Sequence, residues 1–170
     1  MIGIDTLTPE QVAKMWLAGF VRRWHSNPFM AHVDDRLLGH SGRVALLMLG
    51  LWPDTPREAL ISAIVHDLPE VVIGDVSGLA KRNHPALKVA LDVVEAEAAI
   101  EMGCEPSIDP VWGERLHLCD KLDAYLYAKH HRPDRMRLDD WPEALGIISK
   151  RAGCEGVWLE VQDIIKHCAG

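Results

Sequence analysis

Residues 55–75 of the chain read TPREALISAIVHDLPEVVIGD, and this segment decides how the rest of the sequence is interpreted. It opens on Thr55-Pro56, the pattern of a helix N-cap followed by proline in the first turn. Apolar residues then recur at helical spacing: Leu60, Ala63 and Ile64. The predicted helix runs into His66-Asp67, so an imidazole and a carboxylate lie side by side at its end. Both groups bind borderline divalent metals.

The same local signals predict helices on both sides of this segment. Thr8 precedes Pro9 and has Gln11 three residues on, a capping-box pattern, and Asp109-Pro110 marks another start. The predicted helices cover about residues 8–20, 36–51, 55–67, 85–102, 109–127, 142–150 and 155–167. The β-branched run 71–73 is too short for a strand. We therefore predict an all-α fold, with six or seven helices packed as one bundle-like domain over residues 1–170.

Composition limits the classes of function. The 170 residues are 48% hydrophobic and 25% charged, which suits an ordinary globular domain. A formal net charge of −7 argues against a nucleic-acid-binding surface, although a local cluster of cations can still bind a small anion. Residues 1–8 lack the features of a signal peptide, and no apolar run approaches the ~20 residues that span a bilayer. We expect a cytoplasmic protein without membrane association, whose four scattered cysteines are buried free thiols.

Two further residues are candidates to complete a metal site with His66 and Asp67. His40 and Asp120 each lie within an apolar, periodic segment, where an unpaired polar group is costly. Asp123 lies one helical turn after Asp120 and is the alternative last ligand. Polar residues on three buried helices together suggest one divalent metal ion per chain, with Zn, Mn or Co the expected identity.

The order His40, His66-Asp67, Asp120 resembles that of the HD-domain metal-dependent phosphohydrolases, an all-helical superfamily. The match extends to Glu70, Gly74-Asp75 and Lys81, a pattern similar to that of the HD-type 5'-deoxynucleotidases. Upstream, Arg23-Trp24 resembles the Arg-Trp element of that subfamily. The matching residues lie between positions 23 and 127.

The resemblance implies a role for each of these residues. His40, His66, Asp67 and Asp120 would hold the metal, and Glu70 would handle the protons of the attacking water. Asp75 would orient the water or the phosphate. Arg23 and Lys81 would bind phosphate oxygens, and Trp24 would pack against the sugar or base. Local sequence alone also allows Gly74-Asp75 to be a simple turn and Trp24 a core aromatic.

The expected activity is hydrolysis of the 5'-phosphate of (2'-deoxy)nucleotides to give the nucleoside. One alternative is a dATP or dNTP triphosphohydrolase similar to the compact phage enzymes of this superfamily, whose length is close to that of this chain. A further alternative is a nucleotide sensor without catalysis. The expected partners are a small nucleotide and further copies of the chain in a dimer or larger homo-oligomer.

Overall fold

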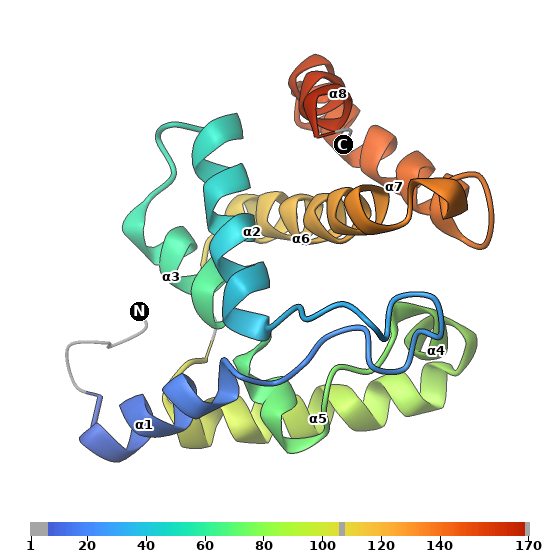
Figure 1. Ribbon diagram of the computed structural model, residues 1–170. Coiled ribbons are helices and arrows are strands. Elements are labelled where there is room, and N and C mark those ends of the chain that lie inside the picture. The colour runs from blue at the N-terminus through green and yellow to red at the C-terminus, as the bar shows by residue number, and fades with distance from the viewer. Residues whose placement is uncertain (1–6, 106–107, 169–170) are drawn as a thin grey trace.

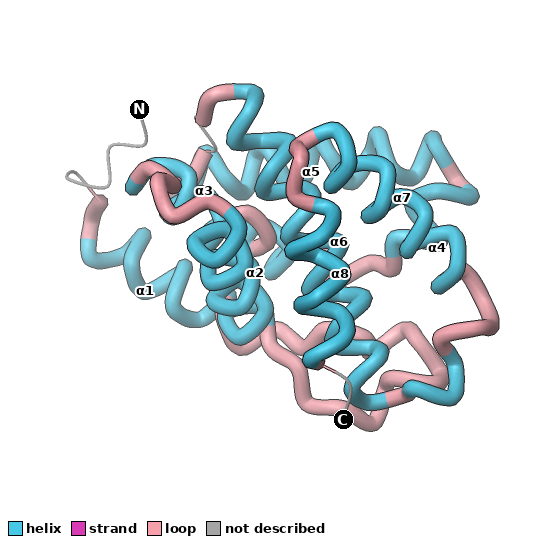
Figure 2. The backbone as a smooth tube through the Cα atoms, turned by 90° about the horizontal axis from the view of Figure 1, so that it is seen from above, coloured by secondary structure: helices cyan, strands magenta, loops and turns pink. Residues whose placement is uncertain are grey.

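The computed structural model describes residues 7–105 and 108–168, and the regular elements within them are all helices. The elements in chain order are α1 (Pro9–Ala18), α2 (Leu37–Leu51), α3 (Arg57–Val65), η2 (Leu68–Val72), α4 (Gly78–Asn83), α5 (Pro85–Met102), α6 (Pro110–His131), η3 (Pro133–Arg135), α7 (Trp141–Cys154) and α8 (Trp158–His167), where η marks a 3-10 helix. Figure 2 shows helices joined by loops, with no strand in this described part. The all-α prediction is confirmed.

The described residues form eight α-helices rather than six or seven. The additional one is α4, six residues whose N-cap Ser77 accepts a hydrogen bond from the backbone N–H of Ala80 at 3.2 Å. It lies just before α5, where the sequence shows little apolar periodicity. The run 71–73 belongs to η2 and the turn after it, as its shortness led us to expect.

Two of the three predicted helix starts are confirmed. The Thr8 hydroxyl accepts from the backbone N–H of Gln11 at 3.2 Å, and the Gln11 side chain accepts from that of Thr8 at 3.0 Å. At the second start, the Asp109 carboxylate accepts from the backbone N–H of Val111 at 2.8 Å. These side chains satisfy donors that the first turn of a helix leaves free.

The predicted cap at Thr55 is wrong. Its hydroxyl donates backward to the carbonyl oxygen of Trp52 at 2.6 Å and that of Met48 at 3.2 Å. Thr55 thus closes the end of α2, and α3 begins at Arg57 after Pro56. The hydroxyl is buried next to carbonyl oxygens at the end of α2, which take its hydrogen as well as a backbone N–H each.

Helix α2 is the centre of the packing, because it contacts both α3 and α6. Helices α7 and α8 continue from α6 on one side, and α1, α4 and α5 lie together on the other (Figure 1). The main core is formed by apolar residues of α2, α3, α6, α7 and α8, among them Val44, Met48, Leu118, Leu122 and Ile148. A second core joins α1 and α5 to the end of α3. The junction between these two groups contains α2, the α3–η2 turn and α6.

Two further expectations can be checked on the described residues. All four cysteines are free thiols, but only Cys104 and Cys119 are buried, whereas Cys154 and Cys168 are exposed. None of the helices combines the length and apolar character that crossing a membrane would require.

Candidate metal centre

Four predicted ligands meet at the junction of the central helices. His40 lies in the first half of α2, His66 and Asp67 occupy the turn between α3 and η2, and Asp120 lies in α6. Because α2 packs against both α3 and α6, these side chains converge. One ligand atom from each lies within 4.8 Å of the others. The group could therefore hold a metal ion.

The geometry of the donor atoms fits a cation. His40 Nε2 lies 3.3 Å from a carboxylate oxygen of Asp67 and 3.3 Å from one of Asp120. His66 Nε2 lies 3.3 Å from the other oxygen of Asp67. Both Nε2 atoms are buried and lack a hydrogen bond of good geometry. Buried polar atoms are normally satisfied, and a cation between these four side chains would satisfy them together.

The second nitrogen of each imidazole has a partner that orients the ring. His40 Nδ1 lies 2.6 Å from a carboxylate oxygen of Asp123, and His66 Nδ1 lies 2.8 Å from the carbonyl oxygen of Ala63. With Nδ1 donating in both, Nε2 is left as a free lone pair, the arrangement typical of metal-binding histidines. Of the two candidates in α6, Asp120 thus faces the cluster, whereas Asp123 supports His40 from behind.

Without a cation, a proton balances the charge of the cluster. Burial lowers the pKa of His40, but its contacts with Asp120, Asp123 and Asp67 outweigh burial and raise the pKa to about 10. Burial raises the pKa of Asp120, but the contact with His40 and the nearby cations hold it well below its usual range. Asp67 is shifted in the same direction. A metal ion would replace the proton on His40, so that metal binding releases protons.

Glu70 lies beside the cluster without being one of the four ligands. It is 6% exposed, and one of its carboxylate oxygens is buried without a hydrogen-bond partner. Burial and the charges of Asp67 and Asp75 raise its pKa to about 8, against the opposing effect of Lys81. A surface role at a helix end, the alternative to a role in proton transfer, does not fit a carboxylate at this depth.

The Lys81 ammonium reaches back to Glu70 from α4. It lies 3.2 Å from a Glu70 oxygen and 3.2 Å from one of Glu95 in α5. The sequence motif did not include Glu95, which faces Lys81 only because α4 folds against α5. Lys81 thus lies next to the candidate proton carrier.

Arg23 is close to the cluster and largely buried, at 8% exposure. Its Nη1 atom lies 3.2 Å from Asp35 and 3.7 Å from Asp123, the residue that supports His40. Its Nε atom is buried without a hydrogen-bond partner. Nη1 of the guanidinium is therefore held by carboxylates, and Nε remains for a further acceptor.

Trp24 is fixed at both its backbone and its ring. Its backbone N–H donates to an Asp75 carboxylate oxygen at 3.0 Å, and its indole N–H donates to Asp35 at 3.1 Å. The ring lies nearly parallel to that of Tyr127, at 6.2 Å between centroids. Its φ of 64° is in the left-handed region. One oxygen of Asp75 is thus engaged by Trp24 in this structure.

The charged network behind the cluster was not predicted from the sequence. Arg43 donates to Asp123 at 2.7 Å and to Asp35 at 3.0 Å, and its guanidinium lies 4.6 Å from the centroid of the Tyr127 ring. A signal for two of these residues was available: Arg43 follows His40 by three positions and Asp123 follows Asp120 by three, which places each pair on one helix face. Asp35, which was not among the predicted site residues, is 2% exposed.

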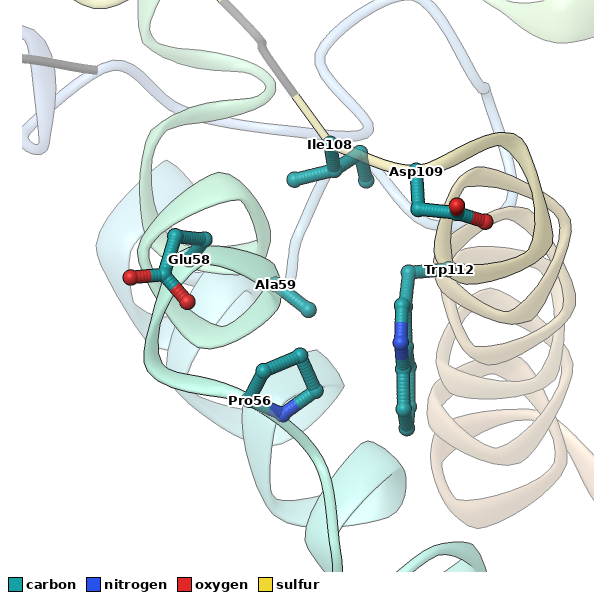
Figure 3. Close-up of a pocket in the computed structure, with 6 residues that line it drawn as sticks. All are labelled: Pro56, Glu58, Ala59, Ile108, Asp109 and Trp112. Atoms are coloured by element: carbon teal, nitrogen blue, oxygen red, sulfur yellow. The ribbon is translucent and has the colours of Figure 1, made fainter. Parts of the chain in front are cut away.

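A pocket of about 300 Å³ lies elsewhere, between the start of α3 and the start of α6 (Figure 3). Its lining residues are Pro56, Glu58, Ala59, Ile108, Asp109 and Trp112. None of the predicted site residues lines it, and the carboxylates of Glu58 and Asp109 point away from its centre in Figure 3. The metal centre is thus defined by its side chains and not by this pocket.

Comparisons with known proteins add nothing to this geometry. No family model matches the chain, and no curated protein or solved structure matches it significantly.

Proposed function

We propose that the chain is a metal-dependent phosphohydrolase of the HD type, which removes the 5'-phosphate of (2'-deoxy)nucleotides. The observation that carries the proposal is the convergence of His40, His66, Asp67 and Asp120 on one point, with Glu70 buried beside them. Glu70 adds a further carboxylate, buried and with one oxygen unsatisfied among the described residues, and a group of this kind beside a metal is a candidate for proton transfer.

The four ligands offer two imidazole nitrogens and two carboxylate oxygens, a set that suits Zn, Mn or Co. A divalent cation held there supplies a Lewis acid that polarises a phosphoryl oxygen and acidifies water. Glu70 accepts the proton of the attacking water as its oxygen bonds to phosphorus. The bond from phosphorus to the 5'-oxygen breaks, and Glu70 returns the proton to the leaving group. Lys81 and Arg23 stabilise the negative charge on the phosphoryl oxygens.

The test of this proposal is a release assay. Purified protein is loaded separately with Mn, Co, Zn or Mg and incubated with each ribo- and deoxynucleoside mono-, di- and triphosphate. Release of inorganic phosphate from monophosphates supports the nucleotidase activity. Release of triphosphate from dNTPs supports the triphosphohydrolase alternative, and binding of nucleotide without release supports the sensor. Absence of both binding and release with every metal contradicts the proposal.

We expect Arg23→Ala to weaken nucleotide binding by about 1.5–3 kcal/mol, the usual value of a charge-assisted hydrogen bond. The reason is that the Nε donor of Arg23 is buried without an acceptor among the described residues, so the proposal assigns it to a phosphate oxygen. Metal content should be unchanged, because Arg23 contacts none of the four ligands directly. Isothermal titration with a deoxynucleoside monophosphate gives the affinity, and elemental analysis gives the metal.

Arg22→Ala is the matched control. Arg22 is adjacent in sequence, and its side chain is 46% exposed and paired with Asp34 at 3.6 Å. Its variant should bind nucleotide like the parent protein. An Arg23→Ala variant with parental affinity would remove the Arg-Trp element from the proposal and widen the class of substrate.

We further propose that two copies of the chain associate through the outer face of α1, which consists of Val12, Ala13, Trp16, Leu17 and Phe20. This α1 face has no charged residue, and Trp16 is 60% exposed. Since an aromatic side chain can bury about 150–250 Å², Trp16 and Phe20 alone expose about 200 Å² of apolar surface. Leu38, which packs against Gly19, extends the face. An apolar face of this kind can serve as the centre of an interface whose rim is polar.

Charge complementarity favours a second copy as the occupant of the α1 face. Glu10, which is 79% exposed on its side chain, lies at the start of α1. Arg36 Nη1 donates to the carbonyl oxygen of Phe20 at 2.8 Å, just past the end of the helix. A two-fold axis perpendicular to α1 would make the two helices antiparallel, and each Glu10 would then approach Arg36 of the partner subunit. Within the chain, Glu10 pairs with Lys14 at 3.4 Å and Arg36 with Asp34 at 2.7 Å.

Trp16→Glu should therefore convert a dimer into a monomer, measured by light scattering coupled to size exclusion. The matched control is Leu159→Glu, at a leucine of α8 that is 73% exposed and far along the chain. That variant should keep the parental mass. A parent protein that is monomeric at all concentrations, or an oligomer that persists in Trp16→Glu, contradicts this assignment.

A further inference from the structure

Asp35 is a buried carboxylate that the proposed reaction does not use. It is 2% exposed, immediately follows the exposed Asp34, and lies just before α2. Burying a carboxylate is costly unless charged or strongly polar donors surround it. Asp35 has three such partners, and all three belong to the candidate site or its support.

On one side, Asp35 holds the Arg-Trp element. A single carboxylate oxygen accepts from Arg23 Nη1 at 3.2 Å and from the indole Nε1 of Trp24 at 3.1 Å. The backbone carbonyl of Asp35 accepts from the backbone N–H of Arg23 at 3.0 Å. Since one atom binds both side chains, it fixes the guanidinium and the indole relative to each other.

On the other side, Asp35 is linked to the metal centre through Arg43. Arg43 Nη2 lies 3.0 Å and 3.1 Å from the two Asp35 oxygens. The same guanidinium donates to Asp123 at 2.7 Å through Nε and at 3.1 Å through Nη2. Asp123 in turn binds His40 Nδ1 at 2.6 Å. A continuous chain of charge-assisted hydrogen bonds thus joins Trp24 to a metal ligand.

We propose that Asp35 is a positioning residue that holds Arg23 and Trp24 in register with the metal centre, so that one nucleotide meets the phosphate-binding and ring-stacking groups together. The inference rests on the proposed function for its substrate. It assigns Asp35 to substrate binding and not to metal binding, because Asp123 binds His40 and Arg43 through contacts that do not involve Asp35.

Asp35→Asn tests this role, because the amide keeps the size of the side chain but removes its charge and places a donor against other donors. We expect KM for a deoxynucleoside monophosphate to rise about tenfold or more, with kcat changed less than threefold and metal content unchanged. The matched control is Asp34→Asn, whose carboxylate is 68% exposed and paired only with Arg22 and Arg36. That control should keep the parental KM.

NMR spectroscopy can test whether Asp35 positions Trp24 in the absence of substrate. The indole N–H resonance of Trp24, assigned in ¹⁵N-labelled protein by its absence in Trp24→Phe, should exchange slowly with solvent in the parent protein. In Asp35→Asn it should shift and exchange faster, whereas in Asp34→Asn it should not move. Rapid exchange in the parent overturns the inference even if Asp35→Asn fails to fold.

A double-mutant cycle completes the test. Because Trp24→Phe already lacks the contact with Asp35, adding Asp35→Asn to it should raise KM by a smaller factor than in the parent. If Asp35→Asn raises KM by the same factor in the parent protein and in Trp24→Phe, Asp35 does not act through Trp24. If the parent protein turns over nucleotide and Asp35→Asn keeps the parental KM, the role of Asp35 is refuted but the proposed function is not. A parent that neither binds nor hydrolyses nucleotide overturns the proposed function itself.

Discussion

Glu70→Gln should lose about 10²–10⁴-fold in turnover while keeping its metal and its affinity for nucleotide. Proton transfer by a positioned side chain is typically worth that factor, and the amide cannot accept the proton. Glu70 is buried beside the four ligands, and its pKa, raised to about 8 by burial and the neighbouring carboxylates, suits a group that both accepts and returns a proton. Single-turnover kinetics on metal-loaded protein measure the effect.

The matched control for this variant is Glu95→Gln. Glu95 contacts the same Lys81 ammonium at the same 3.2 Å but lies on α5, outside the metal cluster. Its loss should cost far less than the loss of Glu70, because only the support of Lys81 changes. If Glu70→Gln turns over at the parental rate, the protein has another proton carrier, and Asp75 would be the next residue to test. If the parent binds nucleotide and never releases product, the chain is a sensor.

His66→Ala and Asp67→Ala should each purify without metal, whereas the parent protein should carry close to one transition-metal ion per chain. Each substitution removes one of the four proposed donors, so the ion would be held by three side chains in place of four. Elemental analysis of freshly purified protein, followed by titration with Zn, measures both occupancy and affinity. The metal-free variants should also melt at lower temperature than the loaded parent, since a ligand bound only to the native state stabilises it.

His84→Ala is a control for this experiment, because His84 is exposed at the start of α5 and is not one of the four grouped ligands. It should keep the parental metal content. The same assay distinguishes the roles of the two aspartates of α6 in metal binding. Asp120→Ala should lose the metal, whereas Asp123→Asn should weaken affinity about 10–100-fold through the orientation of His40. Full occupancy in both His66→Ala and Asp67→Ala would refute the metal site.

Features set by neighbouring residues were predictable from the sequence. The caps at Thr8 and Asp109 depend on side chains that reach a backbone group two or three residues away, and both were predicted correctly. The same rule gave the wrong answer at Thr55, because its hydroxyl had a second set of acceptors in the preceding helix. Local rules identify a competent donor or acceptor, but tertiary packing decides which of two nearby partners it takes.

The candidate site likewise contains residues that the local sequence predicts and residues that only tertiary packing brings together. The four ligands could be proposed because each polar residue interrupts an apolar periodic segment, and this burial pattern is visible in the sequence. The roles of Asp35 and Glu95 could not, because each depends on how separate elements pack against each other. Asp35 meets Arg43 only where the loop before α2 folds back over that helix, and Glu95 meets Lys81 only across the α4–α5 contact.

The left-handed backbone at Trp24 has a consequence for how this protein can change over time. An L-residue with a side chain costs about 1–2 kcal/mol in that conformation, a penalty that glycine avoids. The packing of the ring offsets this cost, because the indole binds Asp35 and lies against Tyr127. A glycine at position 24 would relax the backbone but remove these contacts, so selection for thermostability alone does not favour glycine there.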